Sequence, residues 1–137
     1  MGTIISEEKL AVQKNVSLII YCNNGSVFSN GAKDIGLEIA NKLMKISERN
    51  RTLKIASIMS DIVKGYPSDT TFTGLDVLFN PCYQIDVLQL LINIRKQHNF
   101  RIIWPGTLAD NHLIYSEEGY KDYARFDINK YDITCIM

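Results

Sequence analysis

The chain has 137 residues, 46% of them hydrophobic, and its fifteen basic and fifteen acidic side chains cancel at neutral pH. This size and composition predict one soluble domain that spans residues 1–137 and has its own core. The chain lacks the net charge that draws proteins to nucleic acids or anionic membranes, and it has no apolar run near the roughly 18 residues that a membrane span needs.

The first residues include acidic side chains and lack the uninterrupted apolar core of a signal peptide, which favours a cytoplasmic location. Three cysteines, Cys22, Cys82 and Cys135, lie far apart without C-x-x-C spacing. We therefore expect buried, reduced thiols rather than a zinc site or a disulfide framework, and we expect no cofactor.

The first half of the chain carries strand and helix patterns in turn. The near-continuous apolar run at 16–21 predicts a buried strand at the centre of a sheet. A helix is expected from Ala32 to Ser47, with Ser29 and Asn30 as N-cap residues, because apolar side chains recur there at three- and four-residue steps. A second strand is predicted at 53–59.

The second half continues the alternation and then becomes rich in strand patterns. The run at 72–79 predicts a strand that ends at Asn80 and Pro81, and a helix is expected from Tyr83 to Asn99. Further strands are predicted at 100–104, 112–115 and 131–136. Strands that alternate with helices predict a three-layer α/β fold with a mainly parallel sheet, followed here by a β-rich C-terminal tail.

The segment 22–29, Cys-Asn-Asn-Gly-Ser-Val-Phe-Ser, lies between a predicted strand and a predicted helix, where a P-loop would lie. The P-loop motif G-x-x-x-x-G-K-[ST] uses glycines to wrap the phosphates, a lysine to neutralise them and a hydroxyl for magnesium. Over this segment the second glycine becomes Val27, the lysine becomes Phe28, and the hydroxyl remains as Ser29. The order predicts a P-loop NTPase-like domain whose vestigial nucleotide loop retains Gly25, Ser26 and Ser29.

Four short motifs follow one another between residues 78 and 123. They are L-F-N-P at 78–81, W-P-G at 104–106, L-x-Y at 113–115, and a glycine and a tyrosine at 119 and 123. With Asp86, Leu88 and Leu91 on the intervening helix, this order resembles the BrxF family of small P-loop proteins from type 3 BREX phage-defence systems. The resemblance implies a P-loop fold, and partners such as a PglZ-type protein or the large BrxC-type ATPase.

Two departures from the family pattern bear on chemistry. By the resemblance, the P-loop lysine falls on Phe28 and the acid of the Walker B motif, which holds magnesium, falls on Thr73. Asp76, three residues later, is acidic, and we weigh it as a water-mediated metal ligand against an ordinary polar partner at a strand end. The joint loss indicates that the chain does not hydrolyse nucleotide, so no catalytic or metal-binding residue is assigned.

Aromatic side chains around the predicted loops are the candidate interaction residues. Tyrosine and tryptophan often anchor protein interfaces, although they also serve in packing. The candidates are Trp104, Tyr115, Tyr120 and Tyr123.

Several charged residues admit a functional interpretation beside a simpler one. Lys33 either substitutes for the lost P-loop lysine or is a solvated helix residue. Asp61 and Asp69 either approach a ligand site at the carboxyl ends of the strands or are solvated loop residues. The basic cluster at 95–101, which includes Phe100 as an expected exposed aromatic residue, has two interpretations. It either contacts DNA phosphates or places positive charge at the negative end of a helix dipole.

These observations favour a non-catalytic accessory subunit or adaptor of a BREX-type antiphage system that acts through protein–protein contact. Two alternatives stay open. One is a regulatory subunit that binds ATP or GTP weakly, and the other is a small subunit that contacts DNA through the basic cluster.

Overall fold

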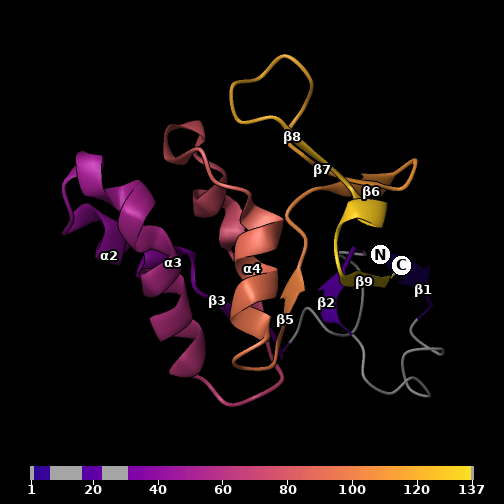
Figure 1. Cartoon of the computed structure of the whole chain (residues 1–137), viewed down its shortest axis with the longest axis horizontal. Coiled ribbons are helices and arrows are strands. Elements are labelled where there is room, and N and C mark those ends of the chain that lie inside the picture. The colour runs from indigo at the N-terminus through magenta and orange to yellow at the C-terminus, as the bar shows by residue number, and fades with distance from the viewer. Residues whose placement is uncertain (1, 7–16, 23–30, 137) are drawn as a thin grey trace.

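The computed structural model describes residues 2–6, 17–22 and 31–136 of the chain, which form two sheets and a set of helices (Figure 1). The main sheet has six strands in the order β1-β9-β2-β5-β4-β3. Every pair within it is parallel. Its strands are β1 (Thr3–Ile5), β2 (Leu18–Tyr21), β3 (Lys33–Asp34), β4 (Thr70–Thr73), β5 (Phe100–Ile103) and β9 (Ile133–Ile136).

The predicted α/β class, with a mainly parallel sheet, is confirmed. The strand expected at 16–21 is β2, and it lies inside the sheet between β9 and β5, as predicted. The β-rich tail is also present, as a second antiparallel sheet with the order β6-β7-β8 followed by β9. The strands of this second sheet are β6 (Thr107–Ala109), β7 (His112–Tyr115) and β8 (Ala124–Asp127).

The helices lie together on one side of the molecule in Figure 1, where α4 packs on β2, and α3 packs between α4 and α2. This arrangement is compatible with a three-layer fold. The α-helices are α2 (Gly36–Met44), α3 (Glu48–Lys64) and α4 (Val87–Arg95), and short 3-10 helices are η2 (Leu75–Phe79), η3 (Pro81–Tyr83) and η4 (Ile128–Lys130). Within the described residues, no helix is long and apolar enough to cross a membrane.

The strand predicted at 53–59 is wrong, because these residues lie inside α3. The buried side chains of α3 are Ile55, Met59, Ile62 and Val63, which follow helical steps, whereas Leu53 is 79% exposed. A short apolar run does not by itself distinguish a strand from a helix. The polar residues that follow the predicted helix end at Ser47 begin α3.

The helix predicted from Ala32 starts later, at Gly36, with Ile35 as its N-cap. The chain first forms the edge strand β3, and the Ile35 N–H donates to the Thr73 carbonyl at 3.1 Å. Ser29 and Asn30, which lie outside the described residues, are therefore not the N-cap. Pairing with β4 takes precedence over the helical periodicity of the segment.

The strand predicted at 72–79 ends at Thr73, and the helix predicted from Tyr83 begins at Val87. Gly74 has a φ of 80°, which turns the chain out of the sheet into η2. The apolar residues after it are buried as part of a 3-10 helix rather than a strand.

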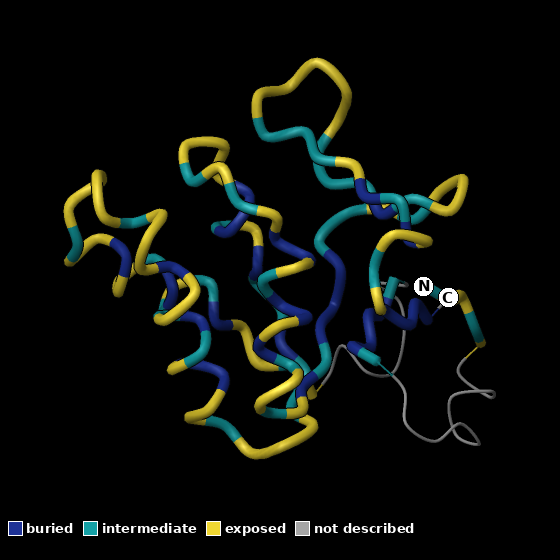
Figure 2. The backbone as a smooth tube through the Cα atoms, viewed as in Figure 1, coloured by how far each residue is buried: buried dark blue, intermediate teal, exposed yellow. Residues whose placement is uncertain are grey.

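The buried residues concentrate in the strands of the main sheet and in the helices beside them (Figure 2), and they form two hydrophobic clusters. On β2, Leu18 and Ile20 join the large cluster shared with the helices, and Ile19 and Tyr21 join a smaller cluster with Ile103 and Ile136 on the opposite face. This explains why β2 reads as an uninterrupted apolar run, since a strand with both faces buried has no polar alternation.

Asp86 ties the start of α4 to the C-terminal part of the chain. One carboxylate oxygen accepts the Gln89 N–H at 3.1 Å as a helix N-cap, and the other accepts the Tyr131 hydroxyl at 2.7 Å. Burial, followed by the hydrogen bond and charge of Asp86, raises the pKa of Tyr131 to about 12.

This contact predicts a pH-dependent stability. The folded state holds the Tyr131 proton more tightly than the unfolded chain, whose tyrosine pKa is near 10. The stabilisation by the Tyr131 hydroxyl is therefore complete below about pH 10 and is lost as pH rises toward about 12. Urea unfolding from pH 8 upward should show the stability of the wild type and of Tyr131→Phe converging across this window, and a constant difference would contradict the assignment.

Candidate functional site

The L-F-N-P motif folds as η2 and η3 and separates two cavities. The larger, of about 300 Å³, is here called the Tyr115 cavity. Helix α2 and Arg51 of α3 line one side of it, and the 3-10 segment, Tyr115 and Asp122 line the other. The cavity therefore lies between two parts of the chain. One part, residues 78–123, carries the family resemblance, and the other part, helices α2 and α3, does not.

Tyr115 stacks on a neighbouring aromatic ring and lies beside two carboxylates. Its ring stacks on Phe79 with the centroids 4.0 Å apart and the planes 9° from parallel. Burial is the main cause that raises the pKa of its hydroxyl, followed by the charges of Asp76 and Asp122 and by hydrogen bonding to Asp76. At neutral pH the phenol is thus a neutral donor held beside two carboxylates.

The other charged groups of the Tyr115 cavity are also held in place. Asp122 accepts the Ser116 hydroxyl at 2.7 Å, and Ser116 has a φ of 66° in the turn after β7. Arg51 donates its Nε–H to the Leu43 carbonyl at 2.9 Å and to the Ile46 carbonyl at 3.1 Å. The Leu43 carbonyl lies in the last turn of α2 and also accepts the Ile46 N–H at 3.1 Å, and Ile46 lies just beyond the helix. Arg51 therefore stabilises the connection between α2 and α3.

Trp104 does not belong to the exposed patch predicted from the sequence, because it is only 1% exposed. Its indole N–H donates to the Ile114 carbonyl at 2.9 Å. Its ring meets Phe79 and Phe126 edge to face, with centroids 5.5 and 5.8 Å away. The residue joins the main sheet to the second sheet and has a packing role.

The predicted tyrosines take three different positions. Tyr115 lines the Tyr115 cavity, and Tyr123 lines the second cavity of about 150 Å³ on the other side of the 3-10 segment. Tyr120 is 63% exposed in the loop between β7 and β8. The structure therefore places the three tyrosines around η2, η3 and that loop, but in no single contiguous cluster.

The vestigial nucleotide loop, including Gly25, Ser26, Val27, Phe28 and Ser29, lies outside the described residues. The structure does describe the carboxyl edge of the main sheet. Thr73 is the last residue of β4, which lies two strands away from β2 in the sheet. Because these strands are parallel, their carboxyl ends lie at the same edge. Asp76 lies beyond this edge in η2 and lines the Tyr115 cavity.

The first residue of helix α2 is closely surrounded at this edge, and its N–H is occupied. The Gly36 N–H donates to the Asp34 carboxylate at 2.9 Å. A Cβ at Gly36 would lie 2.8 Å from the Gly74 carbonyl, and one at Gly74 would lie 2.0 Å from the Asp34 carboxylate. The first turn of α2 is thus closed by an anionic side chain and by the turn that follows β4.

The remaining charged candidates do not converge on one site. Lys33 lies in the edge strand β3 rather than in a helix, Asp61 lies in α3, and Asp69 directly precedes β4 at its amino end. The two aspartates therefore do not reach the carboxyl edge of the sheet, since neither follows a strand.

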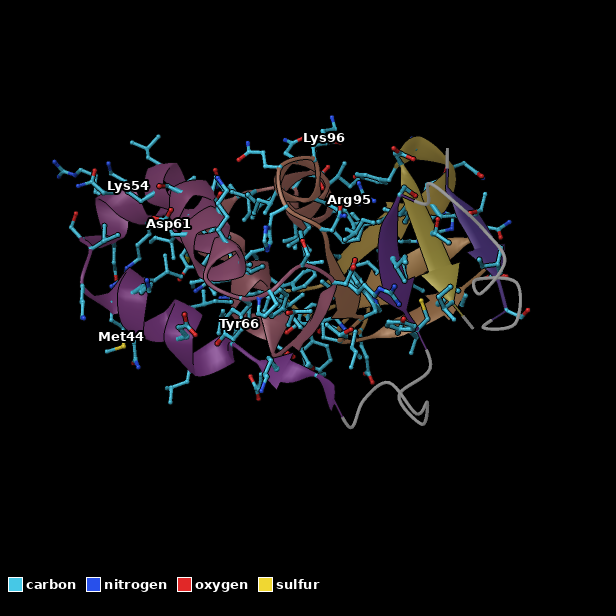
Figure 3. All side chains as sticks on the ribbon, turned by 90° about the horizontal axis from the view of Figure 1, so that it is seen from below. Met44, Lys54, Asp61, Tyr66, Arg95 and Lys96 are labelled. Carbon is cyan, nitrogen blue, oxygen red and sulfur yellow. The ribbon has the colours of Figure 1, made fainter. Side chains whose placement is uncertain are left out.

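The basic cluster does not form one surface. Figure 3 shows Lys96 at the outer margin of the molecule beside the end of α4. Arg101 is half-buried and donates to the Tyr21 hydroxyl at 2.8 Å, and Phe100 is buried rather than exposed as predicted. The sequence placed these side chains together because they are consecutive, whereas alternate residues of β5 face opposite sides of the sheet.

The cysteines are free, and they differ in exposure. Cys135 is buried and Cys22 is half-buried, but Cys82 is exposed, contrary to the prediction for all three. The hydrogen bond that the Cys22 thiol donates to Cys135 is the main cause that raises the pKa of Cys22. In the part of the chain that the structure describes, no group of three or more His, Cys, Asp or Glu residues is arranged to hold a metal ion.

Comparison of the chain with protein families, curated proteins and solved structures finds no match. The site is therefore argued from its own geometry. Sequence reasoning found Asp76 and Tyr115 through their motifs, but it missed Arg51 and Asp122. Arg51 lies in a polar run interpreted as a helix end, and the only available signal for Asp122 was its place beside Tyr123.

Proposed function

We propose that the chain is a non-catalytic accessory subunit or adaptor of a BREX-type antiphage system, with a degenerate P-loop NTPase-like fold, and that it acts by binding other proteins. The observation that carries this proposal is the neutral Thr73 at the carboxyl end of β4, beside the start of α2, because the family resemblance places the Walker B acid at this position. The resemblance at residues 78–123 supplies the biological setting.

Phosphate binding at a helix start depends on free N–H groups and on a positive local potential. At α2 the Gly36 N–H is bound to Asp34, whose carboxylate would repel a polyphosphate. The carboxyl end of β4 presents Thr73, a neutral side chain that does not replace a carboxylate toward Mg²⁺. Both features support a domain without nucleotide turnover, in agreement with the loss of the P-loop lysine at Phe28.

Exposed apolar side chains supply a surface for protein contact. Leu37 and Met44 of α2 are 75% and 72% exposed, and Ala40 lies between them on the same helix face. Met44 projects from the outer margin of α2 in Figure 3 and also lines the Tyr115 cavity. This strip, called here the α2 strip and consisting of Leu37, Ala40 and Met44, adjoins the Tyr115 cavity.

Calorimetry tests the first half of the proposal. We expect no micromolar affinity for Mg-ATP or Mg-GTP in the wild type. We expect none in the combined variant Val27→Gly, Phe28→Lys and Thr73→Asp either, because α2 still begins at the sheet edge with Asp34 on its first N–H. Micromolar binding by the wild type would instead favour the nucleotide-binding regulatory subunit.

Co-purification tests the second half, using a PglZ-type and a BrxC-type protein of a BREX system, the partners that the family resemblance implies. A stable complex is expected, and Tyr120→Ala should weaken it at least about tenfold, since a buried interface tyrosine is typically worth about 2 kcal/mol. Tyr120→Phe is the matched control and should bind like the wild type. A chain that binds neither protein, but shifts DNA in a salt-dependent manner through Arg95 and Lys96, would support the DNA-contacting alternative.

A further inference from the structure

We propose that the Tyr115 cavity receives an arginine side chain of a partner protein, with Asp76 and Asp122 as its acceptors. The inference rests on the proposed function, because it specifies what the adaptor recognises. Its support comes from the size of the cavity, its charge and its neighbouring apolar surface.

The size of the Tyr115 cavity suits a side chain. Cavities that enclose drug-sized ligands or cofactors span about 300–1,000 Å³. The Tyr115 cavity, at about 300 Å³, lies at the lower limit of this range. A single long side chain entering from a docked segment fits that space better than a nucleotide does.

The charges of the Tyr115 cavity select a cation. Its charged lining residues are Asp76, Asp122 and Arg51. Arg51 is engaged through its Nε with the Leu43 and Ile46 carbonyls, which fixes it at the end of α2. The two carboxylates therefore leave a net negative charge, and phosphates or acidic peptides are disfavoured.

The cavity wall favours arginine over lysine. The stacked rings of Tyr115 and Phe79 form an aromatic side, and a planar guanidinium packs on aromatic surfaces while it donates two parallel hydrogen bonds to a carboxylate. Asp122 is already oriented by the Ser116 hydroxyl, and Asp76 lines the same cavity as Tyr115. Preformed acceptors of this kind lower the cost of ordering the site on binding.

The α2 strip indicates what flanks the arginine. Met44 lines the cavity and is also strongly exposed, so a docked segment that inserts an arginine would pass over Met44 toward Leu37. An arginine between apolar residues matches this surface. We therefore choose the blocked peptide acetyl-Leu-Arg-Leu-amide as the probe.

The test is a titration of the full chain with this peptide, followed by amide NMR. We expect shifts at residues 76–80 and 115–122, and at least about tenfold weaker binding for the peptides with citrulline or lysine in place of arginine. Asp76→Asn and Asp122→Asn should each weaken binding, because asparagine keeps an acceptor for Tyr115 or Ser116 but loses the charge.

Asp110→Asn is the matched control. It removes the same charge in the turn between β6 and β7, where the φ of 52° suits asparagine equally well. Equal binding of the citrulline or lysine peptide, shifts away from the cavity, an equal loss in Asp110→Asn or no shifts at all would each overturn the assignment.

The same variants separate this inference from the proposed function. Loss of the purified complex in Asp122→Asn, but not in Asp110→Asn, would support both. A complex unaffected by Asp122→Asn would overturn the arginine site and leave the adaptor proposal standing. Specific peptide binding by a chain that forms no complex with the PglZ-type or BrxC-type protein would support the site and overturn the adaptor proposal.

Discussion

Trp104→Ala is expected to lower the free energy of unfolding by about 3–5 kcal/mol. The side chain is buried, its rings contact Phe79 and Phe126 edge to face, and its indole N–H bonds the Ile114 carbonyl. Truncation removes this packing and leaves the buried carbonyl without its donor. Urea denaturation followed by circular dichroism measures the change, and with a typical total stability of about 5–15 kcal/mol it should be large.

Tyr120→Ala is the control for Trp104→Ala, because it removes an aromatic ring that is 63% exposed. Its stability should stay within about 0.5 kcal/mol of the wild type. A stable Trp104→Ala protein that loses only its partner would contradict the packing role and restore Trp104 to the interaction patch. The pair thus separates two roles that the sequence alone left equal.

Sequence reasoning succeeded where the local pattern and the tertiary environment agree. The strand at β2 was predicted because burial on both faces removes polar residues, and β9 is a comparable, fully buried run. It failed at α3, whose residues 53–59 contain enough apolar side chains to imitate a strand. It also failed at β3, a two-residue strand that only pairing with β4 can specify.

The site was only partly predictable for a similar reason. The sequence singled out Asp76 near the Walker B position and Tyr115 in the L-x-Y motif, but nothing in their spacing says that they line one cavity. Arg51 and Asp122 reach the Tyr115 cavity from α3 and from the loop after β7. Such convergence depends on how the second sheet packs against the helices, which local patterns do not encode.

The W-P-G motif gains a physical account from the contact between the two sheets. Trp104 follows β5, and its indole reaches the Ile114 carbonyl of β7. Gly106 lies against the same carbonyl, because a Cβ there would be 1.9 Å from that oxygen and 2.9 Å from the indole nitrogen. The missing side chain of Gly106 therefore lets the backbone of β7 approach the W-P-G segment. The hydrogen bond from the Trp104 indole then holds β7 in that position.

Gly106→Ala is accordingly expected to destabilise the fold by about 2–4 kcal/mol, because a methyl group is forced against backbone and the Trp104 bond to Ile114 is strained. Gly31→Ala is the matched control, since a Cβ there meets nothing within 4 Å, and its stability should stay near that of the wild type. Combining Gly106→Ala with Trp104→Phe, which lacks the indole N–H, should cost clearly less than the sum of the two single changes, because both act on one contact. Denaturation of the four proteins closes the cycle, and strictly additive costs would show that Gly106 and Trp104 act independently.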